Sequence, residues 1–410
     1  MTKKYWESAD FIRAIPKSDL HVHLDGSLRL ATLIELAREQ KVELPSWTEA
    51  GLRETVYKAR YANLGEYLHG FKYTCAVLRN PESLERVAYE LALDNFAEGV
   101  RYIEPRFAPQ LNAADDLTIE AVLAAVNAGL ERAQREINRR PEIVAGQEPP
   151  FDYGIIGCAM RKFDERFSPY YKDFISCHRY SPFPYLYPLA SLELVRALVD
   201  IRDRKGLPIV GFDLAGEEKG WPADAHREAY DFAHRHFLKK TVHAGEAYGP
   251  PSIFQAITRC HADRIGHGTY LFHSELVEHL PDDEREAYTE ALVQYIADRR
   301  TTVEVCLTSN QQTIPEMTDL ATHPCARMLR EQLSVTLCTD NRLVSDTTVC
   351  AEVSKAVQAF AISPEHLKDI IIYGFKRSFS PLPYAQKRAY VRKVIDYYEA
   401  VEARFASNNH

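Results

Sequence analysis

Two histidines and an aspartate stand at alternate positions near the start of the chain, in residues 18–27, SDLHVHLDGS. Side chains alternate across a β-strand, so His21, His23 and Asp25 would project from one face while the apolar residues between them pack on the other. Two imidazoles on one face can hold a divalent metal through neutral nitrogens. The alternative is a strand whose histidines only make hydrogen bonds in a polar pocket.

Similar residues end three later strand-like stretches. His243 and Glu246 belong to VHAGE, His267 to RIGHG, and Asp340 and Asn341 to CTDN. One such residue would be weak support for a site, because an Asp or His at a strand end is often a cap. A barrel of parallel strands brings all their carboxyl ends to one mouth, so together these residues predict a single site there.

The elements that would position these groups alternate along the chain. Short stretches rich in valine and isoleucine are separated by segments with helical periodicity; they are residues 19–24, 101–107, 153–160, 208–214, 240–243, 263–267, 302–307 and 335–339. Eight such units predict an α/β fold, a closed TIM (β/α)8 barrel. A doubly wound open sheet is the alternative, but its first strand is usually followed by a glycine-rich turn, and DGSLRL is not one.

A long helical excursion, residues 28–99, separates the first two predicted strands. A loop that follows a barrel strand lies on the catalytic face, so the excursion would reach over the mouth. For its apolar side chains, contact with a ligand and ordinary packing on the barrel are equal alternatives. The side chains concerned are Leu64, Tyr67, Leu68 and Phe71.

A second insertion, residues 162–189, follows the third strand and holds nine aromatic residues and four prolines. Left in water, this density would make an exposed apolar patch, so we expect the segment to pack on something. A lid, a subunit contact and extra packing on the barrel are the alternatives. No repeat or linker divides the chain, which predicts one domain over residues 1–410 with both insertions over the mouth.

Composition excludes several classes of protein. Of the 410 residues, 46% are apolar and 26% charged, as in soluble globular proteins. The net charge of −8 argues against nucleic acid or an anionic membrane as a partner. No run of 18 apolar residues exists, and the N-terminus lacks the apolar core of a secretory signal. The eight scattered cysteines fit reduced core thiols, so a cytoplasmic location is expected.

Seven motifs together resemble the adenosine deaminase family of metal-dependent amidohydrolases. They are HVHLDGS, EPRFAP, VGFDLAGEE, VHAGE, RIGHG, CLTSN and CTDN, in the family's order, between residue 18 and about residue 348. The resemblance implies one Zn²⁺ per chain, held by His21, His23, His243 and Asp340. It also implies a zinc-activated water that attacks C6 of a purine. Related two-metal barrels use a modified lysine on the fourth strand, and IVGFDLAG has none, which favours one metal.

The resemblance also assigns the remaining chemistry. Glu246 matches the residue that protonates the purine N1. His267 matches the histidine that takes a proton from the water or stabilises the hydroxide electrostatically. Asp25 matches a contact to the ribose hydroxyl, and Gly216 matches a backbone N–H that meets N3. Where the best-known members have a second Asp, this chain has Asn341, whose amide would donate to N7 directly.

Four further residues of the motifs are expected to have indirect or structural roles. Asp213 would fix a neighbouring group, whereas Arg106, Ser309 and Asn310 would be mainly structural.

The predicted activity is hydrolytic deamination of adenosine or 2′-deoxyadenosine, with a purine nucleoside as the small-molecule partner. The alternatives are deamination of adenine, aminodeoxyfutalosine or an adenine nucleotide, and a non-catalytic barrel used for binding. The sequence favours no oligomeric state.

Overall fold

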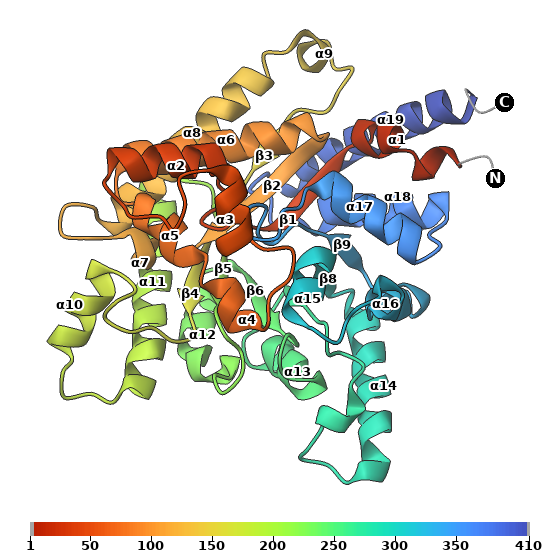
Figure 1. The fold of residues 1–410 in the computed structure, drawn as a ribbon. Helices are drawn as coiled ribbons and strands as arrows, with labels where there is room; N and C mark the ends of the chain where they lie inside the picture. The colour runs from red at the N-terminus through yellow and green to blue at the C-terminus, as the bar shows by residue number, and fades with distance from the viewer. Residues whose placement is uncertain (1–3, 408–410) are drawn as a thin grey trace.

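The computed structural model describes residues 4–407, in which helices surround a ring of strands (Figure 1). The strands are β1 (Lys17–His23), β2 (Val100–Phe107), β3 (Asp152–Tyr153), β4 (Ile155–Met160), β5 (Ile209–Ala215), β6 (Lys239–Ala244), β7 (Arg264–His267), β8 (Thr302–Val305) and β9 (Val335–Leu337). β3 and β4 together occupy the third predicted strand, with Gly154 between them.

The strands form a parallel barrel. Hydrogen-bonded neighbours follow the order β1-β2-β4-β5-β6-β7-β8-β9, while β3 pairs with β2. The ring closes beyond β9, where Val22 forms a parallel bridge with Asp340. The backbone N–H of Asp340 donates to the carbonyl of His21 at 2.8 Å, and that of His23 donates to the carbonyl of Asp340 at 2.7 Å. The predicted (β/α)8 barrel is confirmed. Its closure brings the strand that carries His21 and His23 next to Asp340.

The longer helices are α1 (Ala9–Ala14), α2 (Leu30–Glu39), α3 (Glu49–Thr55), α4 (Leu64–Leu68), α5 (Phe71–Val77), α6 (Pro81–Ala97), α7 (Pro109–Asn112), α8 (Ile119–Ile137), α9 (Pro141–Val144), α10 (Pro169–Cys177), α11 (Phe183–Lys205), α12 (Arg227–Arg235), α13 (Pro250–Thr258), α14 (Asp282–Arg299), α15 (Leu307–Thr313), α16 (Cys325–Arg330), α17 (Val349–Ala359), α18 (Pro364–Arg377) and α19 (Tyr384–Ser407). Short 3₁₀ turns lie at Tyr5–Glu7, Ala223–His226, Ser274–Leu276 and Leu320–Thr322. No helix within residues 4–407 combines the length and apolarity needed to cross a bilayer.

The predicted strand 302–307 was too long. β8 ends at Val305, and Leu307 begins α15. Cys306 has φ −121° and ψ 81° and acts as the N-cap of this helix, so the chain turns two residues earlier than its apolar run indicates. An apolar run shows that a segment is buried, but it does not show where a strand becomes a helix.

The excursion between β1 and β2 folds as α2 to α6. α6 begins at a local cap, in which the side chain of Asn80 accepts a hydrogen bond from the Ser83 N–H at 2.8 Å and Pro81 follows at N1. On α4, Tyr67 is 2% exposed, and its hydroxyl lies 2.8 Å from Ser345 Oγ and 3.4 Å from Asp340 Oδ2. Leu64, Leu68 and Phe71 are half-buried against the core.

The expectation that the aromatic insertion packs was only partly right. Phe163 and Tyr171 are buried and stack with ring centroids 4.1 Å apart, in a cluster that includes Tyr187. Tyr180 and Tyr185, in contrast, are 93% and 72% exposed. They lie between α10 and α11 and on the first turn of α11, beyond the packed cluster. The aromatic composition of the segment predicts that all of these rings pack, whereas the fold buries some of them and leaves others exposed.

Candidate active site

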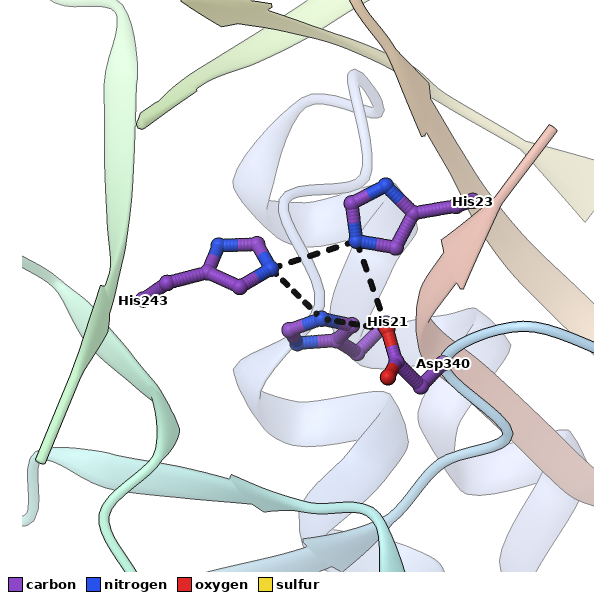
Figure 2. A group of neighbouring side chains, drawn as sticks. All are labelled: His21, His23, His243 and Asp340. Atoms are coloured by element: carbon purple, nitrogen blue, oxygen red, sulfur yellow. Dashed lines mark hydrogen bonds and ion pairs between the residues drawn. The ribbon is translucent and has the colours of Figure 1, made fainter. Parts of the chain in front are cut away.

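Four side chains converge at the carboxyl ends of the barrel strands. His21 and His23 come from β1, His243 from β6, and Asp340 from the closure beyond β9 (Figure 2). The Nε2 atom of His243 lies 3.1 Å from that of His21 and 3.2 Å from that of His23. Asp340 Oδ1 lies 3.4 Å from each of the two β1 nitrogens. One donor atom from each residue fits within 4.8 Å of all the others, and all four residues are buried.

The outward nitrogens of two of these histidines meet carboxylates. His21 Nδ1 lies 2.8 Å from Glu304 Oε2, and His243 Nδ1 lies 3.1 Å from Asp213 Oδ2. An Nδ1–H that donates to a carboxylate leaves the Nε2 lone pair free and directed inward. Burial lowers the pKa of His243, which favours the neutral imidazole that a metal requires. Three inward nitrogens and one carboxylate therefore fit a divalent transition metal such as zinc.

A buried arginine joins the two supporting carboxylates. Arg106 lies 2.9 Å from Asp213 Oδ2 through one terminal nitrogen and 2.9 Å from Glu304 Oε2 through the other. Arg264 approaches the second oxygen of Glu304 at 2.6 Å. All four side chains are at most 1% exposed, and each of these four buried charges has a partner of opposite sign. Arg106 was expected to be mainly structural, yet it neutralises the groups that orient two of the histidines.

Glu246 lies three residues beyond His243, and its Oε1 is 3.8 Å from His267 Nε2. Its side chain is only 9% exposed. Burial, aided by the negative charges of Asp340 and Glu218, raises the pKa of Glu246 to about 8. At neutral pH this carboxyl therefore holds a proton that it can donate.

The loop that carries Glu246 is anchored by a residue that sequence reasoning missed. Glu218 is fully buried, and its Oε2 accepts backbone N–H bonds from Glu246, Ala247 and Tyr248 at 2.6–3.0 Å. Its Oε1 accepts from the Gly245 N–H at 3.1 Å and from the Ser252 hydroxyl at 2.5 Å. The only signal in the sequence is the paired acid of DLAGEE, in which Glu217 is the half-exposed member.

A hydrogen-bond chain sets the tautomer of His267. The Cys325 N–H donates to His323 Nδ1 at 3.0 Å, so neutral His323 carries its proton on Nε2. This Nε2–H donates to Asn310 Oδ1 at 3.2 Å, and the Asn310 amide then donates to His267 Nδ1 at 3.0 Å. Neutral His267 consequently carries its proton on Nε2, the nitrogen that faces Glu246. Asn310, expected to be structural, thus acts directly on a site histidine.

Ser309, the neighbour of Asn310 in CLTSN, also reaches the site. Its hydroxyl donates to Asp340 Oδ2 at 2.5 Å. This bond occupies the oxygen of Asp340 that does not face the histidines, which leaves Oδ1 for them. Ser309 and Asn310 therefore each hold a site residue in place.

The predicted substrate contacts lie around the same mouth. Asp25 is 4% exposed, its Oδ1 has no hydrogen-bond partner within residues 4–407, and burial raises its pKa to about 7. Gly216 follows β5 with φ +99°, a conformation that favours glycine. Asn341 is buried, and its amide donates to Tyr67 Oη at 2.8 Å, which uses one of its two N–H bonds. A buried acceptor without a protein partner, such as Asp25 Oδ1, can accept a hydrogen bond from a ligand hydroxyl.

Comparison with known proteins agrees with this arrangement. A sequence profile of the adenosine deaminase family matches residues 16–169 and 184–397. The unmatched stretch between them lies within the aromatic insertion. An adenosine deaminase from Mycolicibacterium vanbaalenii is 34% identical over 388 residues, covering 94% of this chain and 96% of the relative.

Two solved structures share the fold. An adenine deaminase from Arthrobacter aurescens superposes with a TM-score of 0.73 at 21% identity, covering 94% of this chain and all of that one. An amidohydrolase from Burkholderia ambifaria with bound zinc gives 0.75 at 19%, covering 98% and 95%. The family profile and the relative at 34% identity decide membership: the chain belongs to the adenosine deaminase family.

Proposed function

We propose that the protein is a zinc-dependent aminohydrolase that converts adenosine and 2′-deoxyadenosine to the inosine products and ammonia. The observation that carries the proposal is the convergence of four metal-ligand candidates with Glu246 and His267 at one rim of the barrel. Family membership supports the same reaction class. A barrel used only for binding would need neither a buried protonated carboxyl nor a histidine of set tautomer beside the cluster.

His21, His23, His243 and Asp340 would hold the single metal ion. When bound, zinc supplies a water acidic enough to act as the nucleophile near neutral pH. The fourth barrel strand, β5, carries no lysine that could bridge a second ion. Glu304 and Asp213 keep the imidazoles of His21 and His243 oriented towards the centre.

Glu246 would donate its proton to N1 of the purine while C6 is attacked. The ring nitrogen gains negative charge in this step, and a carboxylic acid buried beside it can neutralise that charge. A pKa of about 8 keeps the acid form dominant at neutral pH. The loop held by Glu218 would keep the carboxyl in position as the proton moves.

His267 would act as a hydrogen-bond donor at Nε2. Of the two roles that the sequence leaves open, proton acceptance needs a lone pair on this nitrogen, and the bonds through His323 and Asn310 place a hydrogen there instead. Electrostatic stabilisation of the nucleophile is the role that this tautomer supports. Burial lowers the pKa of His267, which favours the neutral ring.

Asp25, Gly216 and Asn341 would position the nucleoside. Asp25 has a free acceptor for a ribose hydroxyl, and Asn341 keeps one N–H for the purine N7. We further propose that residues 1–410 form one domain whose segments 28–99 and 162–189 cover the mouth. A core cluster that runs from Phe11 to Val401 supports this organisation. The eight free cysteines support the proposed cytoplasmic location.

A substrate panel tests the proposal. Purified zinc-loaded protein is given adenosine, 2′-deoxyadenosine, adenine, AMP and aminodeoxyfutalosine separately, and ammonia release is followed. We expect the highest kcat/KM for one of the two nucleosides. If only adenine, AMP or aminodeoxyfutalosine reacts, the substrate assignment is wrong. If none reacts and the protein still binds zinc, the enzymatic assignment is wrong.

A further inference from the structure

A second cavity lies at the opposite end of the barrel from the candidate active site. Its volume is about 440 Å³. The walls include Lys239 and Lys240 at the start of β6, Arg264 at the start of β7, and Thr301 just before β8. His243 and His267 stand at the other ends of β6 and β7, so the strands separate the two sites.

The lining is strongly basic, although the chain as a whole carries a net charge of −8. Among the residues that the structure describes, Asp263 is the one carboxylate in the cavity wall. The positively charged residues in the wall are Lys239, Lys240, Arg264, Arg299, Arg300, Lys376, Arg377 and Lys387. A concave surface with charges of one sign concentrates the field and attracts small ions of the opposite sign.

Most of these cations are not neutralised by the protein. Lys239 and Lys240 share Asp263, at 3.6 and 3.0 Å, and Arg264 is bound to Glu104 and Glu304. The remaining five form no ion pair with a carboxylate in the described part of the chain; they are Arg299, Arg300, Lys376, Arg377 and Lys387.

Two of the five are held partly inside the wall. Arg377 Nε is buried and has no hydrogen-bond acceptor within residues 4–407. The ammonium of Lys387 donates to the carbonyl of Ser378. Burial lowers the pKa of Lys387 to about 8, and nearby positive charges add to the effect against the opposing charge of Glu104. Because the wall holds like charges close together, their repulsion raises its electrostatic free energy, and a bound anion would offset that repulsion.

We propose that this cavity binds a small polyanion that carries two or more linked phosphate groups. Guanidinium forks and lysine ammonium groups are the side chains that bind phosphate oxygens best. One phosphate would leave most of the five cations without a partner, whereas a di- or triphosphate chain could reach several. The cavity is concave and small, so it suits a metabolite rather than a nucleic acid.

The test compares two sources of the same chemistry by isothermal titration calorimetry on the zinc-loaded protein. Inorganic triphosphate supplies the phosphate chain alone. Cytidine triphosphate supplies it on a nucleoside that lacks a purine, so the active site does not compete for it. Sulfate at equal ionic strength controls for nonspecific attraction.

The variant Arg300→Gln/Lys376→Gln removes two exposed cations from the wall. Arg139→Gln/Lys393→Gln removes two exposed cations elsewhere and is the matched control. Arg264 is left intact, because it also supports Glu304 and, through it, His21.

We expect triphosphate to bind the wild type and the control variant equally, and the wall variant at least about tenfold more weakly, a loss of about 1.4 kcal/mol. Adenosine turnover should be the same in all three proteins. Equal affinity for both triphosphates would assign recognition to the phosphate chain, and tighter binding of the cytidine compound would assign it to a nucleotide. The proposal is overturned if neither compound binds, if sulfate binds as well as triphosphate, or if both variants lose affinity equally.

Discussion

The backbone nitrogen of Glu246 lies 2.9 Å from Oε2 of Glu218, a residue 28 positions earlier in the chain. The same carboxylate accepts hydrogen bonds from the next two N–H groups, so three consecutive peptide units point at one oxygen. Glu218 thereby determines where the proposed proton donor sits.

Glu218→Gln should lower kcat more than it raises KM. A glutamine side chain has one acceptor oxygen and an NH₂ group, and the NH₂ would face backbone donors that need an acceptor. Loss of general-acid positioning would reduce kcat by about tenfold to a hundredfold while the zinc content stays the same. Glu217→Gln, a change at the half-exposed neighbour, is the control and should leave both constants near the wild type. Equal effects of the two variants would count against a positioning role.

The pH profile should report the raised pKa of Glu246. The acid form is the active one, so turnover should be constant below the pKa and fall about tenfold per pH unit above it. With a pKa of about 8, the fall would begin in mildly alkaline solution. The charge of a bound divalent metal would move this fall in turnover to lower pH. Because Glu218 raises the pKa of Glu246, Glu218→Gln should also shift the fall in turnover to lower pH.

Steady-state rates across the stability range of the protein measure this profile. Glu246→Gln cannot donate a proton and should lose about 10²- to 10⁴-fold in kcat with metal retained. A wild-type rate that keeps rising through the alkaline range, or an active Glu246→Gln, would contradict the assignment.

Glu304→Gln should weaken both metal binding and the fold. Arg106 and Arg264 would lose a buried carboxylate partner, and an uncompensated buried charge costs about 3–5 kcal/mol of unfolding free energy. His21 would lose the acceptor that orients its ring, which should reduce metal affinity about 10- to 100-fold. Chelator competition and urea unfolding measure the two effects. Glu35→Gln breaks an exposed pair with Arg86 and should cost less than about 1 kcal/mol.

Asn310→Asp should invert the tautomer of His267. A carboxylate at this position would accept a hydrogen bond from Nδ1–H and leave the lone pair on Nε2. We expect the ¹⁵N chemical shifts of the ring to change from the Nε2–H pattern to the Nδ1–H pattern and kcat to fall. Asn63→Asp, at an exposed helix cap that an aspartate also serves, is the control. An Nδ1–H pattern in the wild type would show that the hydrogen bonds through His323 and Asn310 do not set the tautomer of His267.

Much of the architecture could be predicted because local sequence patterns determine it. The alternation of β1 set His21 and His23 on one face, and the caps before α6 and α18 are local side-chain bonds. The eight strand stretches were recognised because burial on both faces of a barrel strand demands apolar runs. The predictions were wrong at Leu307, where an apolar run continues from a strand into a helix. They were also wrong at Tyr180, which is exposed although aromatic residues near it in the sequence are buried.

The sequence by itself determined that histidines and acids stand at strand ends and that parallel strands would bring those ends together. Tertiary structure alone decided which groups support them. Arg106 meets Glu304 across 198 residues, and Glu218 anchors a loop 28 residues away. The basic wall collects residues from the starts of β6 and β7 and from three helices, α14, α18 and α19. Periodicity describes each element separately, whereas such partners are chosen by the three-dimensional packing that sets a charge from one element beside a charge from another.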